Sequence, residues 1–151
     1  MYDILTGFDW GRTNVTYGFN PNLSSELQHS FNEIASEITL NSRLTLTRSA
    51  SPDILIGFGD TEGFLGLAYF PGDFPISGDI LLSPDLSRQP ELYQEFVAWH
   101  EFGHALNPEH EEDRQDSVMA INLEGLGVED LPTSFTNYDW WALDTTYYHV
   151  L

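Results

Sequence analysis

The residues from 100 to 110 place the strictest demand on how this chain can fold. They read His-Glu-Phe-Gly-His-Ala-Leu-Asn-Pro-Glu-His, which has the form H-E-x-x-H-x-x-N-x-x-H. On an α-helix, four residues advance by about 400°, so His100 and His104 leave one face a single turn apart and can reach one metal ion. His110 can reach the same ion only if the helix ends before it and the chain turns back.

Three neutral imidazoles are typical zinc ligands. Zn²⁺ takes nitrogen ligands at about 2.0–2.1 Å and, in catalytic sites, keeps a fourth position open for water. Glu101 follows a ligand directly but points in another direction, so it is placed to act on that water rather than to bind the metal. The sequence therefore predicts a zinc ion held by His100, His104 and His110, with Glu101 as the catalytic base, a pattern typical of metalloproteases.

The helix that carries this motif has recognisable ends. Apolar or small residues recur at helical spacing between residues 92 and 106, and Pro90 stands where such a helix can begin. Pro108 biases Asn107 away from the α region, and Asn is the second choice after Gly for a left-handed helix end. We expect the helix to stop there, so that a sharp reversal can return His110 to the metal.

The rest of the chain alternates between strand-like and helical patterns. The strand patterns lie at residues 14–19, 44–48, 53–59, 65–70 and 78–83. One helical pattern covers about 24–40, where Ser25 and Gln28 can form a capping box. Another covers about 137–148, with Thr136 or Asn137 as its cap.

This order predicts an α+β fold, in which three helices pack on one side of a twisted, mixed five-stranded sheet. The apolar run at 53–59 is expected to be buried on both faces of that sheet.

Length and charge exclude several classes of protein. With 151 residues, the natural expectation is one domain. No apolar run reaches the roughly 18 residues that a membrane-spanning helix needs, and no signal peptide is visible. The chain has 24 acidic residues against five basic ones, a net charge of −19, which disfavours nucleic acid and anionic membranes as partners. The acidity has two interpretations: adaptation for solubility or high salt, or attraction of cationic partners and divalent ions.

The zinc motif does not stand alone. Together with Ser117-Val118-Met119-Ala120, the residues from 100 to 110 resemble the metzincin clan of zinc endopeptidases, in which a tight Met-turn places a methionine beneath the metal. Residues 44–47 and 53–58 are similar to the second and third strands of matrixins and serralysins, two families of that clan. The Tyr138-Asp139-x-x-Ala142-Leu143 stretch resembles the start of their last helix.

The resemblance implies a metzincin-like (zincin) fold with an active-site cleft between an upper and a lower part. Residues 1–151 would form a single catalytic domain, without a propeptide or a C-terminal repeat domain. The protein would be a secreted, monomeric zinc endopeptidase with protein or peptide substrates, and Met119 would belong to the Met-turn.

The resemblance also raises the question of calcium. Asp53 and Asp79 fall where matrixins have calcium-binding aspartates. The alternative is that both cap turns or strand ends, since two carboxylates are few for an ion that takes 6–8 oxygens. The chain departs from the family elsewhere: Leu67 and Leu81 stand where matrixins hold a second, structural zinc, and Ile121 stands where serralysins and astacins place a tyrosine.

The expected mechanism needs only the zinc site and Glu101. This carboxylate would take a proton from zinc-bound water as the water attacks a peptide carbonyl, and would then pass the proton to the leaving amine. The substrate would lie as an extra strand along the sheet edge near residues 65–70. Two alternatives remain open: a zinc-binding interaction module without turnover, against which the intact Glu101 argues, and a zinc hydrolase of a non-protein amide such as a cell-wall cross-link.

Overall fold

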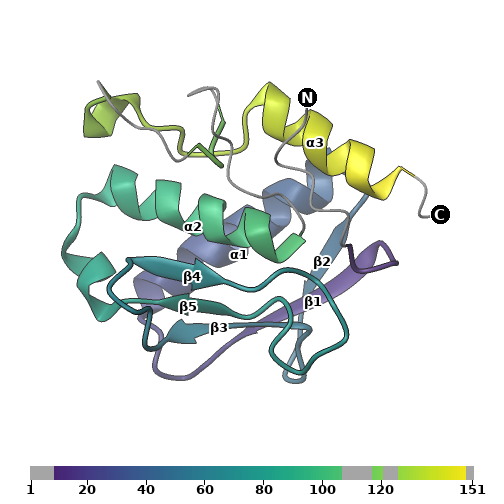
Figure 1. Cartoon of the computed structure of the whole chain (residues 1–151), viewed down its shortest axis with the longest axis horizontal. Helices are drawn as coiled ribbons and strands as arrows, with labels where there is room; N and C mark the ends of the chain where they lie inside the picture. The colour runs from purple at the N-terminus through teal and green to yellow at the C-terminus, as the bar shows by residue number, and fades with distance from the viewer. Residues whose placement is uncertain (1–8, 107–116, 121–125, 149–151) are drawn as a thin grey trace.

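The protein folds around one mixed sheet, with the strand order β2-β1-β3-β5-β4 (Figure 1). The computed structural model describes residues 9–106, 117–120 and 126–148. The elements in these residues are β1 (Asn14–Phe19), α1 (Ser25–Asn41), β2 (Thr45–Arg48), β3 (Ile54–Phe58), β4 (Gly66–Ala68), β5 (Ile80–Leu82), α2 (Glu91–Leu106), α3 (Asn137–Tyr147) and the short 3-10 helices η1 (Pro84–Arg88) and η2 (Val128–Asp130). Strands β2, β1, β3 and β5 are parallel, whereas β4 runs antiparallel to β5 at the edge. Within these residues, the predicted α+β class with a five-stranded mixed sheet and three α-helices is confirmed.

The last two strands are shorter than the sequence pattern predicted. Gly78 lies before β5 with a φ of 80°, outside the extended region, so β5 cannot begin until after it. Strand β4 is likewise confined to three residues of the predicted 65–70. The edge of the sheet is therefore a short β4 that is held by pairing with β5.

The helices of the described residues cover one face of the sheet. Buried side chains alternate along the strands and point to the same side, as Ile54 and Ile56 of β3 do. Leu55 between them is 38% exposed. The expectation that residues 53–59 are buried on both faces is therefore wrong. The reason is that the helices of this fold lie on one side, whereas burial of both faces requires helices on each.

Helix α1 follows its predicted pattern but begins differently. Its apolar residues at helical spacing, such as Phe31 and Ile38, are fully buried. The cap is Ser24, whose hydroxyl accepts a hydrogen bond from the Leu27 amide at 3.4 Å. The predicted capping box of Ser25 and Gln28 does not form, because Ser25 is already helical and the Gln28 side chain donates to the Leu23 carbonyl at 2.9 Å instead.

Helix α2 passes through the centre of the molecule. Every residue from Phe96 to Leu106 is buried. The Phe102 ring packs 6.1 Å from Tyr17 of β1 and 5.9 Å from Phe31 of α1, measured between ring centroids, which joins the sheet and both helices in one core. The second half of α2 is surrounded by protein on all sides, so its polar residues are buried as well. These polar residues are His100, Glu101 and His104.

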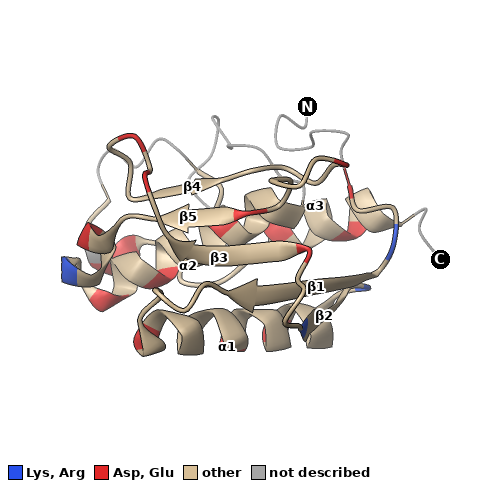
Figure 2. Ribbon diagram, turned by 90° about the horizontal axis from the view of Figure 1, so that it is seen from below, with Lys and Arg blue, Asp and Glu red and all other residues tan. Residues whose placement is uncertain are grey.

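The acidic residues lie almost entirely at the surface. Figure 2 shows them on α1, α2, α3 and the connecting loops, with few basic residues between them. Of the acidic residues that the structure describes, Glu101 and Asp139 alone are buried. No helix in the described part of the chain is long and apolar enough to cross a membrane.

Candidate active site

His100 and His104 meet at one point on α2. Their Nε2 atoms are 3.2 Å apart, and the two rings are nearly perpendicular, with centroids 4.7 Å apart. The one-turn spacing thus brings the two predicted ligands together, as the motif required. Both side chains are buried, so the nitrogen atoms face a site largely shielded from solvent. His110 lies outside the described residues, and its place in the site stays a prediction.

The environment of His100 selects one form of its imidazole. Its Nδ1 atom is 2.8 Å from the carbonyl oxygen of Val118. A carbonyl oxygen can only accept, so Nδ1 must carry the proton, which leaves the Nε2 lone pair directed at His104. Histidines that bind metals commonly donate their other ring N–H to a carbonyl in this way. The donor set therefore fits a zinc ion on the Nε2 side.

The segment 117–120 forms a turn beneath this pair. The Ala120 amide donates to the Ser117 carbonyl at 3.2 Å. Met119 is fully buried, and a side chain added at Gly103 would come within 2.5 Å of its sulfur atom. The methionine therefore fills the space that Gly103 leaves open. Its role in a Met-turn stays a prediction.

Asp139 ties this turn to helix α3, a role that sequence reasoning missed. Its carboxylate accepts hydrogen bonds from the Ser117 hydroxyl at 2.5 Å and from the Val118 amide at 2.9 Å. It also forms a capping box with Thr136, which the spacing of the two residues in the sequence could have shown. Because the Val118 carbonyl binds His100, Asp139 supports the orientation of a candidate ligand through the turn.

Glu101 is the buried carboxylate of the site. Its side chain lies against the backbone of β4, where a Cβ at Gly66 would be 2.7 Å from Oε2. Burial alone raises the pKa of Glu101 to about 8. A nearby positive charge would favour the ionised form. The carboxyl group is thus in a place where binding of a cation would convert it to a base.

A cavity of about 650 Å³ contains all three groups. One wall is β4 with the preceding residues Phe64 and Leu65, and the other is the face of α2 that carries His100, Glu101 and His104. Aromatic rings shape the space around the histidines: Phe70 stands edge-on to His104 at 5.5 Å. The cavity therefore joins an edge strand, two imidazoles and a carboxyl group in a mainly apolar setting.

The structure gives Asp53 and Asp79 separate partners. Asp53 pairs with the Arg12 guanidinium at 2.7 Å and accepts hydrogen bonds from the amide and hydroxyl of Thr16, at 2.9 and 3.1 Å. Asp79 accepts from the Leu55 amide at 3.2 Å. These contacts join neighbouring strands, as the strand-capping alternative requires. The calcium site stays a prediction.

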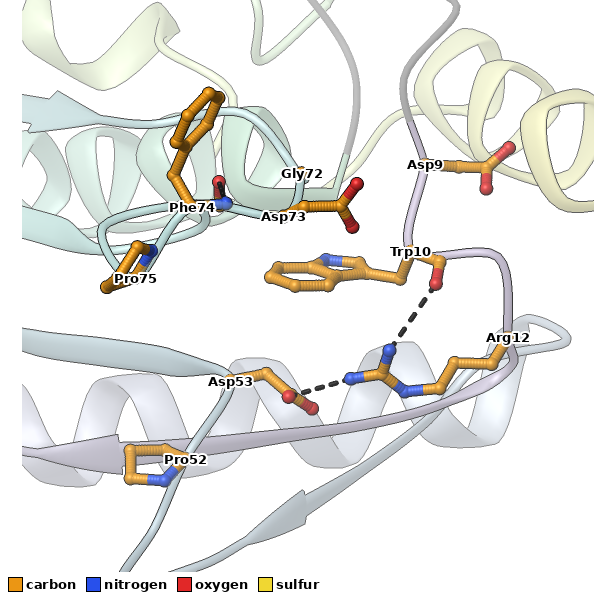
Figure 3. Close-up of a pocket in the computed structure, with 10 residues that line it drawn as sticks. Asp9, Trp10, Arg12, Pro52, Asp53, Gly72, Asp73, Phe74 and Pro75 are labelled. Carbon is orange, nitrogen blue, oxygen red and sulfur yellow. Dashed lines mark hydrogen bonds and ion pairs between the residues drawn. The ribbon is translucent and has the colours of Figure 1, made fainter.

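Asp53 also lines a second cavity, of about 370 Å³ (Figure 3). It lies between residues 9–12, residues 52–53 and the loop at 72–77, with the Trp10 indole in its wall. Asp73 stands at its rim and is exposed. This cavity holds neither Glu101 nor a histidine, so it plays no part in the candidate active site.

The contacts of Asp53 predict a stability that depends on pH. Burial alone would raise its pKa, but the hydrogen bonds from Thr16 and Arg12 and the Arg12 charge outweigh burial and lower it. The unfolded state, with an aspartate pKa of about 3.9, therefore takes up the proton first as the pH falls. The stabilisation is complete above that pH and is lost as the pH falls through the lower, folded-state pKa.

Urea unfolding should show this for Asp53→Asn. The loss in unfolding free energy relative to the unchanged protein should be larger at about pH 6, above the ordinary aspartate pKa, than at about pH 3, below it. Asp73→Asn makes the same change of charge at the rim of the same cavity, where the side chain is exposed, and should show no such trend. An equal loss at both pH values would contradict the assignment.

Neither a scan against protein-family models nor a search of the curated proteins finds a match for this chain. In the part of the chain that the structure describes, no group of three or more His, Cys, Asp or Glu side chains is placed to hold a metal. The interpretation of the site therefore depends on the geometry of His100, Glu101 and His104, with His110 expected as the third ligand.

Proposed function

We propose that this protein is a zinc-dependent endopeptidase of the metzincin type, with a zincin fold and the cleft along β4 as its active site. One observation carries the proposal: His100 and His104 direct their Nε2 atoms at a common point, 3.2 Å apart, in a cavity that also holds the buried Glu101. The zinc ligands would be these two histidines and His110.

The zinc ion, the two histidines and Glu101 have distinct tasks in this proposal. A bound zinc ion would supply Lewis acidity, which activates water and polarises a carbonyl group. His100 and His104 would hold the ion as neutral imidazoles, and the hydrogen bond to the Val118 carbonyl keeps the proton of His100 on Nδ1. Glu101 accepts the proton of the attacking water and delivers it to the leaving amine. Its burial excludes competing solvent around the transferred proton.

The position of β4 supports a peptide as the substrate. It is the last strand in the sheet order, and it forms one wall of the cavity beside Glu101. An extended peptide that paired with this edge would run directly past the carboxyl group. The apolar lining, including the exposed Phe64 and the ring of Phe70, would accept apolar side chains. This arrangement favours peptide hydrolysis over cleavage of a non-protein amide, and a module that only binds zinc needs no such cleft.

Removal of the metal should abolish the activity. The zinc-loaded protein is incubated with a mixed peptide library, with and without a chelator, and the cleavage sites are mapped by mass spectrometry. We expect cleavage at internal peptide bonds that stops with chelator and returns when zinc is added back, because the histidines alone cannot activate water. Zinc binding without any chelator-sensitive cleavage would favour the interaction module, and cleavage restricted to non-peptide amides would favour the other hydrolase.

A further inference from the structure

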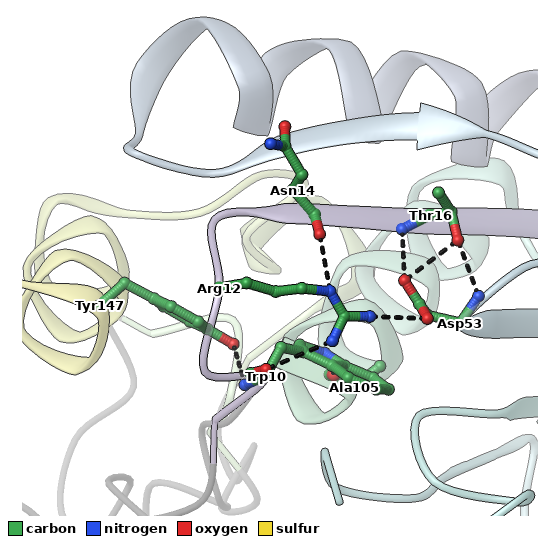
Figure 4. A network of polar contacts seen from close by, with 7 residues as sticks. All are labelled: Trp10, Arg12, Asn14, Thr16, Asp53, Ala105 and Tyr147. Atoms are coloured by element: carbon green, nitrogen blue, oxygen red, sulfur yellow. Dashed lines mark hydrogen bonds and ion pairs between the residues drawn. The ribbon is translucent and has the colours of Figure 1, made fainter. Parts of the chain in front are cut away.

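The carboxyl end of helix α2 is held by side chains that are distant in the sequence. The last carbonyl groups of a helix have no partner within it. Here the Ala105 carbonyl accepts a hydrogen bond from the Trp10 indole nitrogen at 2.9 Å, and the Leu106 carbonyl accepts one from the Tyr147 hydroxyl at 2.7 Å. The Trp10 amide in turn donates to the Tyr147 oxygen at 3.3 Å (Figure 4). The N-terminal segment, α2 and α3 therefore meet where α2 ends.

Both donors are fixed in place. Tyr147 is 1% exposed, and burial raises its pKa well above the usual range, so the hydroxyl keeps the proton that it donates. The Trp10 indole lies against Gly78, and a side chain at that position would collide with the ring. Only glycine leaves this space and also tolerates the positive φ found there.

Arg12 connects Trp10 to the sheet through its hydrogen bonds and its ion pair. Its guanidinium lies 5.5 Å from the indole ring centroid and donates to the Trp10 carbonyl at 3.4 Å and to the Asn14 carbonyl at 3.0 Å. The same group pairs with Asp53 before β3 (Figure 4). The contact with Ala105 is therefore made from a segment that is anchored to β1 and β3.

We propose that Trp10 and Tyr147 are positioning residues for the metal centre. This inference rests on the proposed zinc site. Ala105 and Leu106 directly follow the candidate ligand His104, and the chain continues from them towards His110. Two donors on these carbonyls prevent the last helical turn from fraying, which would displace His104 and the point from which the chain leaves the helix. A ligand that is already in place loses less freedom when it binds the metal.

The variant Tyr147→Phe tests this directly. It removes one hydroxyl and keeps the buried ring, and we expect roughly tenfold weaker zinc binding, comparable to the loss of other residues that orient ligands. The dissociation constant is measured by competition with a chromophoric chelator, at a temperature where circular dichroism shows each variant folded. Tyr148→Phe is the matched control, because the adjacent Tyr148 is 71% exposed and holds neither carbonyl.

Trp10→Phe provides a second, independent variant. It removes the indole N–H but keeps an aromatic ring beside Gly78, and should also weaken zinc binding while Tyr148→Phe does not. If both variants are less stable but bind zinc as tightly as the unchanged protein, the two residues are only structural and the inference is overturned. If the unchanged protein itself binds no zinc, both the proposed function and this inference fail. If all the variants bind zinc tightly, only this inference fails.

Discussion

Glu101→Gln should lower the rate of peptide cleavage by about 10²–10⁴-fold, the usual contribution of a general acid–base group. Glutamine has nearly the same shape and fits the space between α2 and β4, but its amide can neither take the proton from water nor deliver it to an amine. Zinc binding should be unchanged, because the ligands are the neighbouring histidines. Cleavage of a library-derived peptide and the zinc content are measured on the same preparation.

The fold should not suffer from this change. Burial disfavours the charged form of Glu101, as its raised pKa shows, so a neutral amide removes an unfavourable ionisation. Glu95→Gln is the matched control, because it makes the same substitution earlier on α2, outside the cavity. Full activity in Glu101→Gln would show that another group is the base. Lost activity with lost zinc would instead indicate a structural role for Glu101.

Asp139→Ala is expected to reduce the free energy of unfolding by about 3–7 kcal/mol. Two buried donors, the Ser117 hydroxyl and the Val118 amide, lose their acceptor, and an unsatisfied buried donor costs about 1–3 kcal/mol. The half of the α3 capping box in which the Asp139 carboxylate accepts from the Thr136 amide is lost as well, which costs about 1 kcal/mol. Against a total stability of roughly 5–15 kcal/mol, this is a large fraction. Chemical denaturation followed by circular dichroism measures it.

A second variant separates the two contributions of Asp139. Thr136→Ala removes the capping hydroxyl but leaves the contacts with Ser117 and Val118, and should cost only about 1 kcal/mol. Asp139→Ala should also weaken zinc binding, because the Val118 carbonyl that orients His100 is no longer held. Equal losses in the two variants would show that the link between α3 and the turn contributes nothing.

Local sequence patterns were enough to predict most elements of this fold. The apolar spacing of α1 and the alternation in β1 depend only on residues that are close together in the sequence. The structure has the helix and the strand where these patterns predicted them. One failure lies where neighbouring elements decide: Leu55 is exposed because none of the described helices covers its face of the sheet. The other is local: the cap of α1 is Ser24, one residue before the predicted one, because its hydroxyl reaches the Leu27 amide.

In the candidate active site, too, some features follow from local sequence and others only from the tertiary structure. The four-residue spacing of His100 and His104 places both imidazoles on one face of any helix, so the sequence alone determined that they can share an ion. Tertiary structure alone decided what orients and surrounds them. Asp139 reaches the Val118 amide across 21 positions, and Trp10 reaches Ala105 across 95 and Tyr147 across 137. No periodicity extends over such distances, because these contacts exist only after the sheet and its helices have packed together.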